Sequence, residues 1–154
     1  MSTTIDVIDR QRVLRVSGRW LATVVRRALE RQGVAAAEIC VLLLDDRGIA
    51  RLHERWLGIT GPTDVITFDL AAVPGQGGLH GDIAVSAETA RRTARALGWQ
   101  PRHELAYYVV HGILHLSGYD DHDPKDRRAM RARERVLMRA AGLPAPPPSR
   151  RSRR

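Results

Sequence analysis

The segment at residues 103–118, HELAYYVVHGILHLSG, constrains the fold of this chain more than any other. Its apolar side chains recur with the 3.6-residue period of an α-helix, at Leu105, Tyr108, Val109, Gly112 and Leu116. A helix with such a stripe has to bury it against another element. The continuous apolar run EICVLLLDD at residues 38–46 is typical of a strand that is buried on both faces. Together the two segments predict an α+β fold in which helices pack on one small sheet.

Alternation, helical spacing and capping residues predict the other elements. Strands are expected at residues 63–70 and 81–86, and the start of the chain, TIDVID followed by RVLRVSG, predicts a strand or a hairpin. Helices are expected at 19–31, 47–58, 86–98 and 124–141. In the second of these, Ile49, Leu52 and Trp56 should point inward. The sum is a small mixed sheet of about four strands packed with about five helices, and a mobile glycine-rich loop at 71–80.

Length and charge limit the domain organisation and the partners. Residues 1–142 are expected to form one domain, and residues 143–154, LPAPPPSRRSRR, a disordered Pro- and Arg-rich basic tail. The chain carries 25 basic and 17 acidic residues, which indicates a polyanionic partner, RNA rather than a membrane. Only Lys125 is a lysine, so the arginine excess could equally reflect genome base composition. With one cysteine, Cys40, and no recognisable signal peptide, a cytoplasmic location is expected.

The segment HGILHLSGYDDHD, residues 111–123, predicts a metal site. His111 and His115 are four residues apart on one helix, so both imidazoles can reach one tetrahedral ion. Gly118 ends the helix and lets the following loop return a third ligand. Glu104, seven residues before His111, is expected on the same side, where it could hold a ligand histidine in its tautomer. The alternative is a pair of surface histidines on an amphipathic helix.

Three blocks of the chain resemble the YbeY family of bacterial endoribonucleases, which are rRNA maturation factors. HGILHLSGYDDHD is similar to that family's HGxLHLxGYDH, whose three histidines bind zinc. GPTDVITFDL resembles its PTDVLSFP strand, and GDIAVSAETA its GDIxIS segment, so the resemblance covers about Glu38 to Leu137. It implies an α+β, single metal-binding domain with one zinc ion that cleaves single-stranded RNA in the cytoplasm. It also implies a role in small-subunit rRNA maturation and ribosome quality control, with the small ribosomal subunit, ribosomal proteins and an Era-type GTPase as partners.

The chain departs from the family pattern at three places. The family spaces its histidines as H-x3-H-x5-H, whereas here an extra aspartate puts Asp121 in register and His122 one residue later. We favour His122 as the third ligand, because imidazole is the commoner zinc ligand, with Asp121 as its substitute. Leu57 stands where the family has an arginine, so Arg55 is the candidate to clamp phosphate. Tyr107 stands where many members carry a further histidine.

These residues leave more than one function open. The favoured function is a zinc-dependent endoribonuclease with His111, His115 and Arg55 as catalytic residues; residues that bind the rest of the RNA are not predicted. The alternative is a non-catalytic ribosome-assembly or RNA-binding factor with a structural zinc, which the loss of arginine at Leu57 favours. A zinc peptidase is a third class, and Gly112 counts against it because it replaces the glutamate base of HExxH enzymes.

Overall fold

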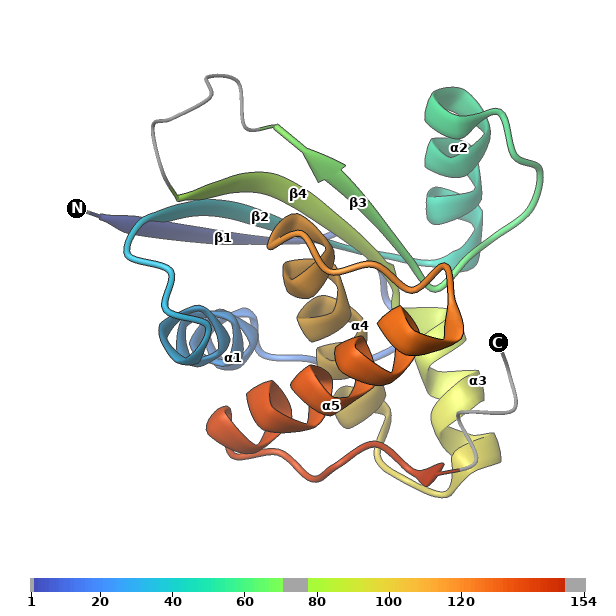
Figure 1. Cartoon of the computed structure of the whole chain (residues 1–154). Helices are drawn as coiled ribbons and strands as arrows, with labels where there is room; N and C mark the ends of the chain where they lie inside the picture. Colours follow the sequence, from blue (N-terminus) through green and yellow to red (C-terminus); the bar gives the residue numbers. More distant parts are fainter. Residues whose placement is uncertain (1, 71–77, 149–154) are drawn as a thin grey trace.

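Four strands form one mixed sheet in the computed structural model, which describes residues 2–70 and 78–148 (Figure 1). The strands are β1 (Thr3–Asp9), β2 (Ala37–Leu44), β3 (Val65–Asp69) and β4 (Leu79–Ser86), in the order β1-β2-β4-β3. β1, β2 and β4 run parallel, while β3 pairs antiparallel with β4 at the edge. The predicted small mixed sheet is confirmed. The first strand is not followed by a hairpin, because β1 pairs with β2 instead.

Helices cover the two faces of the sheet unequally (Figure 1). α1 (Gly18–Arg31), α3 (Ala87–Leu97), α4 (Pro101–Leu116) and α5 (Pro124–Ala140) lie on one side, and α2 (Asp46–Leu57) lies apart from them. The helix expected at 19–31 is confirmed as α1, and five of its side chains are buried on one side: Leu21, Val24, Val25, Ala28 and Leu29. α1 and α4 pack on the inward side chains of the two central strands, Ile39, Val41, Leu43, Ile83 and Val85.

α4 is more deeply buried than its predicted stripe suggests. Every residue from Glu104 to Leu114 is buried, because the helix lies between the sheet, α1, α3 and α5. Gly112 marks the closest approach to the sheet: a Cβ there would lie 2.8 Å from Ile83 Cγ2 and 3.0 Å from Thr67 Cγ2. The absence of a side chain at Gly112 therefore lets the C-terminal end of α4 sit directly against β3 and β4.

The outer face of the sheet is only partly covered. α2 buries Ile49 fully and Leu52 partly, but Trp56 is 61% exposed, so its predicted inward position is wrong. Trp56 does contact Phe68 of β3, with ring centroids 6.4 Å apart, but both rings line an open pocket on the outer face of the sheet, which leaves much of Trp56 exposed. The prediction that β2 is buried on both faces is also wrong for its first half, where Glu38 is exposed and Cys40 half-buried.

Asp46 joins α2 to α3. Its Oδ1 accepts hydrogen bonds from Ser86 Oγ and Thr89 Oγ1, both at 2.6 Å, and Arg92 donates to Oδ2 at 2.9 Å. Burial opposes ionisation most strongly, but these hydrogen bonds outweigh it and lower the pKa of Asp46. Ser86 Oγ also accepts a hydrogen bond from the Thr89 backbone N–H, as an N-cap residue does, so the same hydroxyl caps α3 and donates to Asp46.

The chain beyond α5 is described as far as residue 148. Leu143 packs against the hydrophobic core, and residues 145–148 line a cavity with α4 and α5. The predicted disordered tail, 143–154, therefore begins with residues that have a defined position, and its part from 149 onward lies outside the described residues. Most of the loop predicted to be mobile, residues 71–77, also lies outside them. No helix of the described chain is long and apolar enough to cross a membrane.

Candidate metal centre

Two histidines meet at the C-terminal end of α4. His111 and His115 are one helical turn apart, and their Nε2 atoms are 3.0 Å apart. His111 is buried, whereas His115 is half-buried and faces a cleft. Burial, followed by the neighbouring His111 ring, lowers the pKa of His115. The neutral imidazole that results is the form that binds a metal ion.

Asp121 completes a group of three donors. Its Oδ2 lies 3.7 Å from His111 Nε2 and 3.9 Å from His115 Nε2. All three donor atoms lie within 4.8 Å of one another. With metal–ligand bonds of about 2.0–2.1 Å, neighbouring donors of a tetrahedral ion are about 3.3–3.4 Å apart. The observed separations of 3.0–3.9 Å lie on both sides of that value, so the residues fit an ion such as zinc.

His122 is not among these three donors, and instead forms a second, mostly exposed group with Asp120 and Asp121. Its side chain is 87% exposed, and its Nε2 lies 3.2 Å from Asp120 Oδ1. Arg127, from the first turns of α5, donates from NH1 to the His122 carbonyl oxygen at 3.1 Å and to that of Asp121 at 3.4 Å. These bonds fix the backbone of the loop with the Asp121 side chain turned toward the histidines. The structure thus brings Asp121, the residue in register with the family motif, to the pair, and not the preferred His122.

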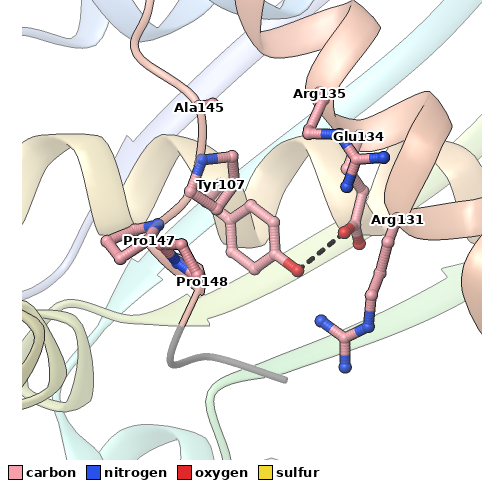
Figure 2. A pocket seen from close by; sticks show the side chains of 8 residues that line it. Tyr107, Arg131, Glu134, Arg135, Ala145, Pro147 and Pro148 are labelled. Atoms are coloured by element: carbon pink, nitrogen blue, oxygen red, sulfur yellow. Dashed lines mark hydrogen bonds between the residues drawn. The ribbon is translucent and has the colours of Figure 1, made fainter.

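Glu134 holds His111 from the other side. Its Oε2 lies 2.5 Å from His111 Nδ1, and its Oε1 accepts a hydrogen bond from the Tyr107 hydroxyl at 2.7 Å (Figure 2). Glu134 is buried, so the carboxylate favours the tautomer with hydrogen on Nδ1 and leaves the Nε2 lone pair directed at the donor group. Tyr107 therefore supports the carboxylate that orients His111.

The sequence predicted this supporting role for Glu104 and missed Glu134. Glu104 is buried two turns earlier in α4 and accepts a hydrogen bond from Trp99 Nε1 at 2.9 Å. Seven residues of helix rise about 10.5 Å, so its carboxylate lies too far along the axis to hold His111. A signal for Glu134 does exist in the sequence: it interrupts the buried apolar side of α5, between Met130, Leu137 and Met138. A carboxylate in such a position needs a buried partner.

The donor group opens into a cleft of about 420 Å³. One wall is the start of β3, with Asp64, Val65 and Thr67, and the other is formed by the three donors. The Asp64 carboxylate accepts a hydrogen bond from the Val65 backbone N–H at 2.8 Å, which orients the carboxylate just before the first residue of β3. The cleft is large enough for water and part of a substrate to reach the donors.

Arg55 lies in the last turn of α2, where its guanidinium is 5.6 Å from the centre of the Trp56 ring. Leu57 is exposed at the same helix end. The residues that line the cleft come from β3, α4 and the loop after α4, so the structure does not bring Arg55 together with the histidine pair.

Comparison with known proteins shows the family to which the chain is similar. The family model described as Endoribonuclease YbeY matches residues 5–142. Proteins named Endoribonuclease YbeY from Anaeromyxobacter sp. (strain Fw109-5) and Mycobacterium sp. (strain KMS) are 43% and 40% identical over 129 and 134 residues. These alignments cover 84% and 80% of this chain, and 67% and 75% of those proteins.

A third relative, from Anaeromyxobacter dehalogenans (strain 2CP-C), is 46% identical over 70% of this chain. The chain spans 55% of that protein's length. A solution structure of a Thermotoga maritima protein shares the fold, with a TM-score of 0.64 at 24% identity over 90% of this chain and 89% of that one. On the family model and these identities together, the chain belongs to the Endoribonuclease YbeY family.

Proposed function

We propose that this protein is a zinc-dependent endoribonuclease that cleaves single-stranded RNA. The observation that carries the proposal is the donor group of His111, His115 and Asp121, open to a cleft, in a chain of the Endoribonuclease YbeY family. Three protein donors with an accessible side are the pattern of catalytic zinc sites. A single-stranded substrate fits a cleft whose walls are one strand edge and one helix end, because an unpaired backbone can enter it.

The side chains around the cleft would each contribute differently to RNA cleavage. A zinc ion bound there would supply an activated water and a Lewis acid for the scissile phosphate. His111 is held in one tautomer by Glu134, so its Nε2 is fixed before any ligand arrives. Arg127 holds the loop that presents Asp121. Asp64 faces the donors across the cleft, where its carboxylate can accept a proton from a water or hydroxyl bound between them.

The alternative function is a ribosome-assembly or RNA-binding factor whose zinc is structural. Leu57, in place of the family's arginine, favours this alternative. The openness of the site favours catalysis, because structural zinc sites are closed by four protein ligands. We therefore favour the endoribonuclease over the non-catalytic factor.

We further propose that the substrate is ribosomal RNA of the small subunit, in its maturation and quality control, and that the protein acts in the cytoplasm. The net charge of +8 supports a polyanionic substrate. Contacts with ribosomal proteins and an Era-type GTPase remain predictions.

Cleavage of matched single- and double-stranded fragments of small-subunit rRNA tests the function. We expect the wild type to cut only the single strand, to lose activity with a chelator and to regain it with added zinc. His115→Ala should abolish cleavage, and His122→Ala, a neighbouring histidine outside the donor group, should not. RNA binding that survives chelation without any cleavage would favour the assembly factor. Cleavage that is equally fast in chelator would overturn the role of the metal.

A further inference from the structure

A second cavity lies beside Glu134 (Figure 2), and it shares no lining residue with the cleft. It has a volume of about 350 Å³ and is formed by α4, α5 and residues 145–148. A small void of about 10 Å³ lies against both regions, and it shares Tyr107, Arg131 and Glu134 with the cavity. It shares His111 and Asp121 with the cleft. The cavity is therefore the next hollow along the surface from the donor group.

Three arginines of α5 follow this path. Arg127, Arg131 and Arg135 are spaced four residues apart, so they lie on one side of the helix and each is about 6 Å farther along its axis. Arg127 lines the void, Arg131 lines both void and cavity, and Arg135 lines the cavity. The row leads from the loop that carries Asp121 to the proline segment.

Arg131 and Arg135 have charge available for a ligand. Within the described part of the chain, neither takes part in an ion pair or a hydrogen bond. The nearby carboxylate of Glu134 is engaged at both oxygens, by Tyr107 and His111. In Figure 2 the two guanidinium groups lie on either side of Glu134, at the rim of the cavity. Guanidinium groups bind phosphate through paired hydrogen bonds.

The opposite wall of the cavity is apolar. It consists of Ala145, Pro146, Pro147 and Pro148. Figure 2 shows Ala145, Pro147 and Pro148 on one side of the Tyr107 ring and the two arginines on the other. A wall of proline rings can pack against the flat face of a base, since burying both apolar surfaces is favourable. A hollow with cations on one side and an apolar wall on the other matches a nucleotide, which has a phosphate and a base.

We propose that this cavity is a second RNA site, which binds nucleotides adjoining the scissile step. Arg131 and Arg135 bind successive phosphates, and a base packs against Pro146–Pro148. This proposal rests on the proposed function, because the nucleotides in the cavity would belong to the RNA molecule that is cleaved in the cleft. The RNA would therefore run along α5, and not past Arg55 at the end of α2.

The other arginines of α5 provide a matched control. Arg133 donates to Gln32 Oε1 at 2.7 Å and to the Arg31 carbonyl oxygen at 3.1 Å, so it ties α5 to α1. Arg128 and Arg139 are exposed on the same helix and line none of the three hollows. Replacing these two removes the same charge without touching the cavity.

The test is the binding of a labelled trinucleotide and a labelled dodecamer of single-stranded RNA, with chelator present to prevent cleavage. We expect the double variant Arg131→Ala/Arg135→Ala to bind the dodecamer about tenfold more weakly, and to bind the trinucleotide almost as tightly as the wild type does. Two lost phosphate contacts should also reduce the salt slope of dodecamer binding by about 1.4. Arg128→Ala/Arg139→Ala should change dodecamer affinity less than about threefold. Equal losses in both double variants, or equal losses for both lengths, would overturn the proposal.

Replacing Pro146, Pro147 and Pro148 by serine tests the base contact without altering charge. The wild type should bind the dodecamer more tightly than an abasic strand with the same phosphates, and the serine variant should lose that preference. A preference that persists refutes the proline contact, and displacement of RNA by an acidic peptide of equal charge would refute nucleotide recognition. If the wild type binds in this length-dependent manner but never cleaves RNA, the proposed function fails while this site stands.

Discussion

Replacing Glu134 by glutamine isolates the charge that supports the metal centre. Glutamine has the same shape, so its Oε1 can accept from the His111 Nδ1–H while its amide donates to the Tyr107 hydroxyl oxygen. Both buried contacts are kept, although the Tyr107 hydroxyl changes from donor to acceptor, and the negative charge is lost. We therefore expect the Glu134→Gln variant to fold, with a weaker centre.

The expected size follows from the role of the carboxylate. Removing a partner that orients a ligand histidine costs about 10–100-fold in metal affinity, or about 1.4–2.7 kcal/mol. A charge-assisted hydrogen bond is about twice as strong as a neutral one, and the neutral bond remains, so the loss should be near tenfold. Competition for zinc against a coloured chelator at fixed pH measures this affinity. Glu134→Leu should lose more zinc affinity and should also unfold at a lower temperature, since the buried His111 and Tyr107 groups lose their bonds to Glu134.

Glu104→Gln is the control. Glu104 is also a buried carboxylate, but it accepts a hydrogen bond from Trp99 and lies two helical turns before His111, so zinc affinity should stay within about twofold while thermal stability falls. If Glu134→Gln folds and binds zinc as tightly as the wild type, the orienting role is refuted. If Glu104→Gln loses zinc instead, the sequence-based assignment was the correct one.

Three further predictions test the donor set and the packing. Asp121→Ala should lower zinc content at least about tenfold, whereas His122→Ala should leave it unchanged by elemental analysis. Gly112→Ala should cost about 1–3 kcal/mol in urea unfolding, because its Cβ would lie 2.8 Å from Ile83 Cγ2; an unchanged midpoint would contradict the close approach. The folded pKa of Asp46 is below its ordinary value of 3.8, so its stabilisation is present above about pH 4 and lost as the pH falls through the folded value. Asp46→Asn should therefore destabilise the protein at neutral pH and flatten the acid branch of the stability curve.

Local signals made most of the helices predictable. The inner side of α1 and the N-caps at Ser86 and Asp123 depend on neighbouring residues, so the sequence contains them directly. Trp56 was predicted inward because it shares the helical period of Ile49. Its exposure depends on how α2 packs against Phe68 of β3, a strand about which the helical period of α2 carries no information.

The centre was predictable only where its residues share one helix. His111 and His115 follow from a four-residue spacing, but Glu134 reaches His111 from a different helix, and no spacing reveals that contact. The position of Asp121 depends on how Arg127 draws the loop backbone onto α5. In both cases the deciding contact is between elements whose packing the sequence pattern does not specify.

The closeness of the donors along the chain has a consequence for chelation experiments. His111 and Asp121 are separated by little more than a helical turn and a short loop, so a bound ion would fasten α4 only to the segment that follows it. Closing so short a loop removes little freedom from the unfolded chain, and the core between the sheet, α1 and α4 is assembled without it. Unlike a zinc finger, which collapses when its metal is withdrawn, this protein should survive demetallation intact. A loss of activity after chelation would then show that the metal is needed for the reaction, and not that the protein has unfolded.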